Sequence, residues 1–285
     1  PPLTRKSDGL PIGAVSGFCN MLQRYVDENH GDDAPTHAAV IFDKGSHTFR
    51  NDLYDQYKAN RDKMPEDLRP QIPLTREATR AFNISCEEVE GYEADDIIAT
   101  LAVQARDAGG VVTIISSDKD LMQIVGDGVE MFDAMKRRKI DKDGVFEKFG
   151  VFPDRVVDIQ ALAGDSIDNV PGAPGIGVKT AALLINEYGD LETLLERAGE
   201  IKQPKRRETL INHADQIRLS KQLVTLDCNV PLEFTIEDLE VRNPVPEVLL
   251  GFLKDMEFQT LTRRIAERLG VDTPLIEEAF SFMED

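Results

Sequence analysis

Hydrophobic positions in the first half of the chain follow two alternating periodicities. Short runs of β-branched and other apolar residues, bounded by polar residues or glycine, are typical of buried strands and occupy residues 36–42, 84–89, 111–116 and 129–132. Helical spacing of apolar residues fills the intervals at residues 48–61, 65–82, 94–108 and 119–125. This alternation predicts an α/β fold with a mainly parallel sheet flanked by helices.

The strand pattern fades near residue 153, and only helical periodicity continues. Predicted helices cover residues 153–163, 177–188, 190–197, 206–225 and 247–257. We therefore expect an α/β core at 1–152, a C-terminal helical lobe at 153–260 and an acidic tail at 261–285, with 273–285 as a frayed helix.

The composition is that of a globular chain with a strong acidic excess. Of 285 residues, 41% are hydrophobic, and 52 acidic against 33 basic residues give a net charge of −19. Taken alone, this charge argues against nucleic acid, because phosphate contacts need lysine and arginine. Carboxylates that hold metal ions are neutralised in use, however, and DNA contacts depend on local patches.

Cysteine usage and hydropathy indicate the compartment. Cys19, Cys86 and Cys228 lie far apart and suggest no disulfide framework, so we expect a reduced, cytoplasmic chain. No apolar run reaches the length of a membrane span and no signal peptide is visible, so we expect no membrane partner.

Carboxylates recur where the predicted strands end and in one loop of the helical lobe. They are Asp43, Glu93, Asp95, Asp96, Asp118, Asp120, Asp165 and Asp168. The carboxyl ends of parallel strands meet at one edge of a sheet, where ligands bind. Because like charges repel, such a cluster calls for a cation. Hard oxygen ligands select Mg²⁺ or Mn²⁺, and paired metal ions suit phosphodiester hydrolysis.

Each acidic motif also has a structural interpretation. Acids at 93–96 complement the dipole of a helix N-terminus, yet three acids in four positions exceed what a cap needs. Asp118 and Asp120 fit a turn with an N-cap. They also fit a phosphatase-like pair, with Asp118 as nucleophile and Asp120 as general acid. That class needs further motifs downstream, and none can be placed in the sequence.

The most specific stretch is residues 164–181, where two acids directly precede a glycine-rich turn that runs into a helix. Glycines let the backbone approach a phosphate closely, and N–H groups at a helix N-terminus receive it. The candidate contacts to the DNA backbone are Gly172, Gly175, Gly177, Lys179 and Thr180. The structural alternative is a plain helix–helix connection.

The predicted helix at 48–61 is a second candidate for DNA contact. Its candidate residues are Arg50, Tyr57, Lys58 and Arg61. In isolation a solvated helix face is the simpler interpretation, but its position just after Asp43 favours the functional one. The basic runs 136–139 and 205–207 could also contact phosphates, whereas the scattered histidines argue against a histidine metal site.

The order and spacing of these motifs resemble the 5′-nuclease (5′-3′ exonuclease) domain of the flap endonuclease family, as bacterial polymerases carry it. The resemblance covers residues 1–258 and rests on 40–43, 48–50, 57–58, 93–96, 117–120 and 164–181. It implies a PIN-like sheet that carries two catalytic metal ions, Mg²⁺ or Mn²⁺. The first ion would lie nearest Asp43, Glu93, Asp95 and Asp96, and the second nearest Asp118, Asp120 and Asp165, with Asp168 close by.

The resemblance also implies how DNA is held. Helix 48–61 would form part of an arch for a 5′ single strand, with Lys58 and Arg61 as its basic residues. The glycine-rich turn would be a helix-hairpin-helix-like motif that grips duplex DNA, often with K⁺. The implied substrate is DNA with a 5′ flap or branched duplex, in replication and repair, including removal of Okazaki primers. The implied setting is the bacterial nucleoid, and the protein a monomer naturally fused to a polymerase domain.

One family feature is missing from this sequence. Family members begin with a strand that ends in Asp-Gly and supplies another metal carboxylate, whereas this chain starts at Pro1, just downstream. We therefore expect the chain to bind branched DNA yet cleave it poorly. Our first interpretation is a structure-specific 5′ nuclease. The alternatives are a DNA-binding module with an incomplete, inactive metal site, and a phosphohydrolase that uses Asp118 as its nucleophile.

Overall fold

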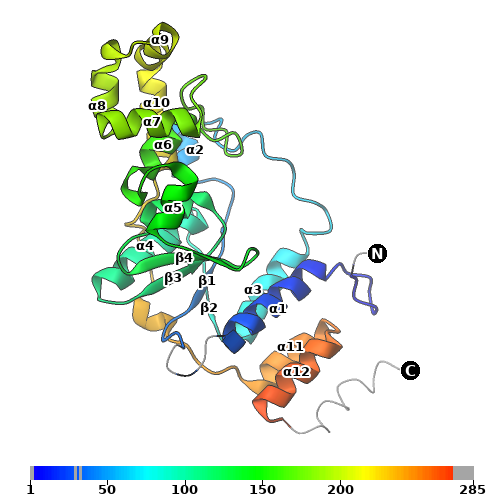
Figure 1. The fold of residues 1–285 in the computed structure, drawn as a ribbon. Helices are drawn as coiled ribbons and strands as arrows, with labels where there is room; N and C mark the ends of the chain where they lie inside the picture. The colour runs from blue at the N-terminus through cyan, green and yellow to red at the C-terminus, as the bar shows by residue number, and fades with distance from the viewer. Residues whose placement is uncertain (1–2, 29–30, 32–33, 272–285) are drawn as a thin grey trace. The chain divides into compact units, whose positions relative to one another are not determined.

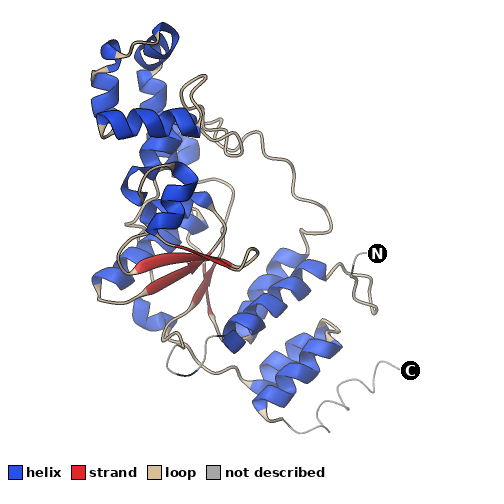
Figure 2. Ribbon diagram, viewed as in Figure 1, coloured by secondary structure: helices blue, strands red, loops and turns tan. Residues whose placement is uncertain are grey.

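The computed structural model describes residues 3–28, 31 and 34–271, and the chain divides into two compact units (Figure 1). The first unit combines 1–42, 63–87 and 234–285, and the second combines 43–62 and 88–233. Each unit is therefore assembled from segments that are distant in the sequence. Helices dominate both, and the strands are short (Figure 2). Within the described residues, no helix has the length and apolar character needed to cross a membrane.

The first unit contains a two-stranded sheet and a group of helices. Strands β1 (Ala39–Ile41) and β2 (Ser85–Glu87) pair in parallel, with Val40 opposite Cys86. The helices are α1 (Gly13–Glu28), α3 (Gln71–Ala81), η5 (Ile236–Leu239), α11 (Pro246–Asp255) and α12 (Gln259–Leu269). Buried residues of α1, α3, α11 and α12 share one hydrophobic core, so helices from opposite ends of the chain pack together.

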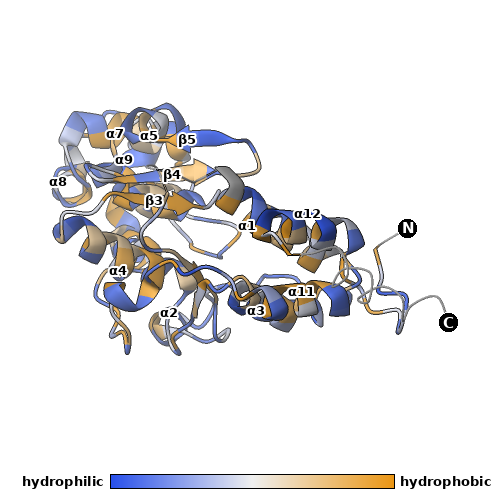
Figure 3. Ribbon diagram, turned by 90° about the horizontal axis from the view of Figure 1, so that it is seen from below, coloured by the Kyte–Doolittle hydropathy of each residue, from blue (hydrophilic) through white to orange (hydrophobic). Residues whose placement is uncertain are grey.

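The second unit contains the sheet that positions part of the candidate site. Strands β3 (Val112–Ile115) and β4 (Val129–Asp133) are parallel, and β5 (Arg138–Ile140) is antiparallel to β4. Ile114 and Met131 lie opposite each other and are buried, and hydrophobic residues colour much of β3 (Figure 3). The helices around this part of the chain are α2 (Phe49–Leu53), α4 (Ala94–Asp107), η2 (Lys119–Ile124) and α5 (Lys142–Phe149).

A group of helices completes the second unit. They are η3 (Pro153–Arg155), α6 (Val156–Ala163), α7 (Val178–Tyr188), α8 (Leu191–Glu196), η4 (Ala198–Glu200), α9 (Pro204–Asn212) and α10 (Ala214–Val224). One hydrophobic core extends from Ala99 in α4 through the sheet and these helices to Leu226. The sheet and the helices of this unit therefore share one core.

The predicted strands are all present: β1, β2 and β3 are shorter than expected, and β4 extends one residue beyond its predicted end. Two of the three strand pairs are parallel, which confirms the α/β class with a mainly parallel arrangement. The strands are divided between two sheets, β1–β2 and β3–β4–β5. The sequence pattern did not predict β5, α1, α5 or α12.

The predicted helix at 48–61 is wrong beyond its first turns. Only α2 is helical, Tyr54 is extended, and Lys58 adopts a left-handed φ of 58°. The backbone N–H of Lys58 donates to the carbonyl of Asp168 at 2.9 Å. A contact with a distant loop therefore overrides the local helical pattern, as tertiary contacts often do.

Other boundaries also differ from the prediction. The helix expected at 65–82 begins only at Gln71, directly after Pro70, and the one expected at 206–225 is two helices that meet at His213. The tail does not begin at 261, because Leu261 and Ile265 of α12 are buried in the core of the first unit. The frayed helix predicted at 273–285 lies outside the described residues.

Candidate active site

The turn after β3 positions two acidic side chains. Asp118 is the N-cap of η2, and its carboxylate accepts the backbone N–H of Asp120 at 3.0 Å. Gln160 in α6 holds Asp120 from another side, because its Nε2 donates to Oδ1 of Asp120 at 2.5 Å. The N-cap interpretation of Asp118 is confirmed, and it places both carboxylates at the end of a parallel strand.

A short loop after α6 presents two more acids. The backbone groups of Asp165 and Val170 bond each other at 3.0 and 2.7 Å, which closes the loop. Asp165 and Asp168 are only 7% and 8% exposed, a rare environment for carboxylates. Carboxylate oxygens of Asp120, Asp165 and Asp168 lie within 4.8 Å of one another. The fold thus brings acids from two distant motifs together.

The N-terminus of α4 supplies acids from a third segment. Glu93 is the N-cap, and Asp95 and Asp96 lie in the first turn. Asp43 stands at the same helix end, because its Oδ1 accepts the backbone N–H of Ala94 at 2.8 Å. The positive end of the helix dipole favours negative charge at this position, so the dipole interpretation also holds.

Asp95 lies close to acidic side chains from several of these segments. Burial, followed by the charges of neighbouring acids, raises the pKa of Asp95 to about 8. Those neighbours are Asp118, Asp120, Glu93 and Asp43. Burial also raises the pKa of Asp120, and the charges of Asp118 and Asp165 act in the same direction, although Lys119 opposes them. Excess negative charge of this kind favours binding of a divalent cation.

Lys119 lies inside the acid cluster. Its Nζ bonds a carboxylate oxygen of Asp165 and lies 3.5 Å from Oδ1 of Asp120. Burial raises the pKa of Asp165, but the hydrogen bond and charge of Lys119, together with the backbone N–H groups of Ile167 and Asp168, lower it, and the net pKa is lowered. Sequence reasoning overlooked Lys119, although its place between two candidate ligands was the available signal. Gln160 was also missed, and its helical position gave no signal.

The donor set of the cluster fits a hard divalent cation. Every candidate ligand offers a carboxylate oxygen, which suits Mg²⁺ or Mn²⁺ better than a soft metal. The residues that could hold metal ions are Asp43, Glu93, Asp95, Asp118, Asp120, Asp165 and Asp168.

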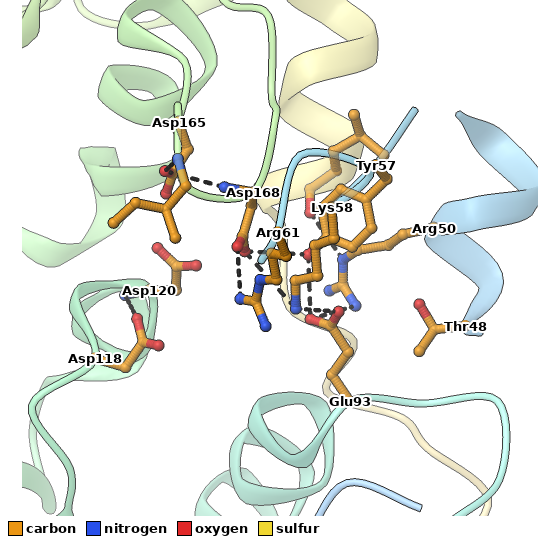
Figure 4. A network of polar contacts seen from close by, with 12 residues as sticks. Thr48, Arg50, Tyr57, Lys58, Arg61, Glu93, Asp118, Asp120, Asp165 and Asp168 are labelled. Atoms are coloured by element: carbon orange, nitrogen blue, oxygen red, sulfur yellow. Dashed lines mark hydrogen bonds and ion pairs between the residues drawn. The ribbon is translucent and has the colours of Figure 1, made fainter. Parts of the chain in front are cut away.

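Three side chains from the segment after α2 face these acids (Figure 4). Nζ of Lys58 lies 2.5 Å from Oε1 of Glu93, and Nη2 of Arg61 lies 2.7 Å from Oδ1 of Asp168. The hydroxyl of Tyr57 donates to Oε2 of Glu93 at 3.2 Å, and burial together with the nearby acidic charges raises the Tyr57 pKa, which keeps it a donor. Tyr57 is 5% exposed, which contradicts its predicted contact with DNA.

Arg50 and Asp96 form a buried ion pair instead of binding DNA and metal. Arg50 is 1% exposed, so the predicted DNA contact of Arg50 is wrong. Asp96 is fully buried, and each of its oxygens accepts one Arg50 donor at 2.7 Å. Its oxygens also accept the N–H groups of Asp227 at 2.9 Å and Glu93 at 3.1 Å. Four donors fill the acceptor positions of this carboxylate, which contradicts a ligand role for Asp96.

The glycines of the turn before α7 differ in what they do. Gly172 is buried, and a Cβ there would lie 2.4 Å from the nitrogen of Gly164. Its N–H and carbonyl bond side chains of α10, so the predicted phosphate contact of Gly172 is wrong. Around Gly175 and Gly177, by contrast, a Cβ would meet nothing within 4 Å. Lys179, in the first turn of α7, is exposed, and Thr180 is half-buried.

Two consecutive family models match the chain. The 5′-3′ exonuclease N-terminal resolvase-like domain matches residues 1–150, and the 5′-3′ exonuclease C-terminal SAM fold matches residues 151–247. Together with the α/β fold and the acid cluster, these matches define a metal-dependent nuclease. The chain belongs to the 5′-3′ exonuclease family.

Two kinds of relative carry this family's sequence. The chain is 36% identical to a 5′-3′ exonuclease of Aquifex aeolicus, with 93% of this chain and 89% of that protein aligned. It is 58% identical to DNA polymerase I of Rhizobium leguminosarum and 38% identical to DNA polymerase I of Bacillus subtilis, over 100% and 97% of this chain. It spans only 28% and 31% of those two polymerases.

Solved structures share the fold. T5 5′-exonuclease with bound divalent metal ions (zinc) matches with a TM-score of 0.68 at 23% identity, over 85% of this chain and 90% of that one. The catalytic core of Rad2 in complex with a DNA substrate matches with a TM-score of 0.53 at 14% identity, over 89% and 82%. At these identities the likeness establishes the fold alone.

Proposed function

We propose that this chain is a structure-specific 5′ nuclease that hydrolyses DNA phosphodiesters at a 5′ flap or branch. The observation that carries the proposal is the convergence of carboxylates, with oxygens of Asp120, Asp165 and Asp168 within 4.8 Å. In the same unit, Arg61 pairs with Asp168 and Lys58 pairs with Glu93. Acids that bind metal ions beside cations that bind phosphate suit a phosphodiester substrate.

Two Mg²⁺ or Mn²⁺ ions complete the proposed site. Asp43, Glu93 and Asp95 would hold the first, and Asp118, Asp120, Asp165 and Asp168 the second. Paired divalent cations supply Lewis-acid stabilisation of the attacking and leaving oxygens of a phosphodiester. The polypeptide holds these carboxylates in place: Gln160 fixes Asp120, and the backbone N–H of Ile167 fixes Asp165 at 2.9 Å.

Lys58 and Arg61 have a second task in this proposal. Lys58 pairs with Glu93 at 2.5 Å, and Arg61 pairs with Asp168 at 2.7 Å. When those carboxylates are neutralised, the ammonium and guanidinium groups are released to bind the oxygens of the scissile phosphate. A guanidinium and a phosphate match each other in a two-pronged geometry, which orients the phosphate for attack.

The turn before α7 would hold the duplex part of the substrate. The open surface at Gly175 and Gly177, the first N–H groups of α7, and the side chains of Lys179 and Thr180 suit a DNA phosphate without reading bases. We include K⁺ at this turn in the proposal. The wider setting we propose is replication and repair at the bacterial nucleoid, by a monomer fused to a polymerase domain, as in the polymerase relatives.

Cleavage of a labelled 5′-flap substrate by the full natural protein tests the proposal. We expect cleavage with Mg²⁺ or Mn²⁺ and none with a chelator. Asp165→Asn should lower the single-turnover rate by on the order of 10²-fold, because a misplaced reacting group is costly. Asp143→Asn is the matched control, since Asp143 is exposed in α5.

The rival interpretations predict other outcomes. A DNA-binding module would bind the flap substrate with metal present and leave it intact. A phosphohydrolase would form an aspartyl-phosphate at Asp118, detectable by mass spectrometry after an acid quench. Either result would replace the nuclease proposal.

A further inference from the structure

Arg50 is a charged side chain sealed inside the second unit. Its Nε donates to the carbonyl of Leu223 at 2.8 Å, and Nη2 donates to the carbonyl of Thr225 at 3.0 Å. Nη1 and Nη2 also bond the two oxygens of Asp96, and Nη1 lies 3.5 Å from Oε2 of Glu93. The guanidinium therefore reaches two carbonyls and two carboxylates at once, and Figure 4 shows Arg50 beside one of these carboxylates, Glu93.

These partners lie at the ends of two helices. Leu223 and Thr225 flank Val224, where α10 ends, and carbonyls at a helix end lack partners within the helix. Asp96 is the third residue of α4, in the first turn that follows the N-cap Glu93. A cation suits the first position and an anion the second. Arg50 thus joins the C-terminal end of α10 to the helix N-terminus that carries Glu93.

The same helix, α10, also holds the glycine-rich turn. Oγ of Ser220 accepts the N–H of Gly172 at 2.9 Å, and Nε2 of Gln216 donates to the carbonyl of Gly172 at 2.8 Å. Gly172 is pressed against Gly164, the residue before Asp165, and neither position has room for a Cβ. One helix is therefore bonded to the candidate DNA-backbone turn through Gln216 and Ser220 and, at its C-terminal end, to α4 through Arg50.

We propose that Arg50 is a positioning residue that, through α10, fixes the distance between the phosphate held at the glycine-rich turn and the phosphate that is cleaved. Asp96 is the partner through which Arg50 is bonded to α4. The inference rests on the proposed nuclease function and goes beyond it, because it assigns the choice of the cleaved phosphate to a buried pair that contacts neither DNA nor metal.

Only the planar fork of arginine can hold this arrangement. Arginine presents its donors in a fixed fork and makes two parallel bonds to a carboxylate, whereas lysine is a flexible point charge. Arg50→Lys keeps the charge but gives up the simultaneous bonds to α4 and α10. The structural alternative is that the pair only stabilises the fold, in which case product length would not change.

The test measures where and how fast the full natural protein cuts a 5′-labelled flap substrate, with nucleoside triphosphates withheld. For Arg50→Lys we expect the dominant product to be joined by products cut at neighbouring phosphates. The single-turnover rate should fall by on the order of 10²-fold, as expected for a shift of the reacting group by about 1 Å. Affinity for the uncleaved substrate in Ca²⁺ should stay within a few-fold of the wild type.

Asp158→Asn is the matched control. Asp158 is 4% exposed and pairs with Lys221 of α10 at 3.0 Å, so the variant also removes the charge of a buried carboxylate that is paired with α10. It should lower the thermal midpoint and leave product length unchanged. The inference would be overturned if Arg50→Lys gave products of wild-type length. It would also be overturned if the cleavage rate fell only in proportion to the loss of thermal midpoint, as in the control.

Two further variants keep the inference testable if Arg50→Lys does not fold. Gln216→Leu removes a bond to Gly172 near the start of α10, at a half-buried position, and should broaden the distribution of product lengths in the same way.

Asp96→Asn should keep the wild-type number of bound Mn²⁺ ions, whereas Asp165→Asn should lose one. Unchanged product length in Gln216→Leu, or a lost ion in Asp96→Asn, would contradict the inference. A wild-type protein that never cleaves would overturn the nuclease proposal itself, and the inference with it.

Discussion

Asp95 and Asp96 are neighbours in the sequence with opposite environments. Asp95 faces other acids, and burial with their charges raises its pKa to about 8. Asp96, one residue further around the helix, is fully buried against Arg50. From the sequence we predicted that both are metal ligands. The spacing of residues along a helix does not show which side chain contacts a buried arginine. The two roles can be told apart only from the residues that each side chain contacts in the folded protein.

The raised pKa of Asp95 makes stability depend on pH. Its ordinary pKa is 3.8 and its folded pKa about 8, so between these values the folded state holds a proton that the unfolded state has lost. The free energy of unfolding therefore falls as pH rises through this window, by at most about 1.4 kcal/mol per pH unit, and the loss is complete above the folded pKa. Asp95→Asn should be more stable than the wild type at pH 8–9 without divalent metal.

Thermal melts at several pH values in a chelator check this prediction. Asp143→Asn, an exposed acid of α5, should keep the wild-type pH dependence. An Asp95→Asn curve that runs parallel to the wild type across the whole range would show that Asp95 is not repelled by its neighbours. With Mn²⁺ added, the advantage of the variant should shrink or reverse, because the wild-type carboxylate then gains a partner.

Lys119 should compete with metal ions for its carboxylates. Its Nζ bonds Asp165 and lies 3.5 Å from Oδ1 of Asp120, two of the proposed ligands. We expect Lys119→Ala to bind Mn²⁺ about tenfold more tightly, which corresponds to roughly 1.4 kcal/mol of competing ion-pair energy. Titration of free Mn²⁺ by electron paramagnetic resonance measures this. Lys142→Ala, which removes an exposed pair with Asp127, should leave affinity unchanged. Weaker binding by Lys119→Ala would mean that Lys119 supports the site instead.

At the scale of elements, the sequence predicted the types of most elements but not all of their geometry. Runs such as 111–116 were recognisable because β-branched residues between polar breaks favour buried strands. The hairpin of β4 and β5 was missed because its turn lies in the basic run 136–139, interpreted as phosphate-binding. There Arg137 has a left-handed φ of 51°, Arg138 pairs with Glu147, and Lys139 pairs with Glu130 at 2.7 Å.

The segment after α2 shows why the rest could not be predicted. Its sequence has helical spacing, yet the chain leaves the helix at Tyr54 so that Lys58 and Arg61 can reach Glu93 and Asp168. Those contacts join positions far apart in the chain, and no local pattern encodes them. Residues of the site that lie in recognisable motifs, including Lys58 and Arg61, were found, whereas Gln160, which is tied to the site only by a contact with Asp120, was not.

The first turn of α7 should act as an element that grips DNA backbone. Lys179→Ala should weaken binding to plain duplex equally for all sequences and lower the salt slope by about one phosphate contact, because a phosphate contact releases counterions without reading bases. Fluorescence anisotropy across a salt titration measures both. Lys142→Ala, an exposed lysine of α5 outside the candidate DNA contacts, is the control and should change neither. An unchanged slope in Lys179→Ala would leave the turn as a plain helix connection.

At the scale of the whole molecule, a net charge of −19 is expected to repel DNA, which is the proposed substrate. The distribution of charge within the candidate site can offset this repulsion. Acids that would repel DNA are gathered in one cluster, where Lys58, Arg61 and Lys119 neutralise part of the charge and metal ions would neutralise more. The cations that we propose bind DNA phosphates, among them Lys58, Arg61 and Lys179, lie on separate segments of the second unit. Total charge is therefore a poor guide to partners when part of it is concentrated in a candidate metal site.

This arrangement predicts that divalent metal stabilises the fold. A ligand that binds only the folded state adds stability that grows with the logarithm of its concentration, about 2.7 kcal/mol at one hundred times its dissociation constant. For a chain of this size that corresponds to a rise of roughly 5–10 °C in thermal midpoint. Melts in millimolar Mg²⁺ or Mn²⁺, against monovalent salt at the same ionic strength, should show the rise for the wild type. Asp165→Asn should lose most of it, whereas Asp143→Asn should keep it in full. Equal rises in all three proteins would mean that the cations act by general screening and that the acid cluster is not their site.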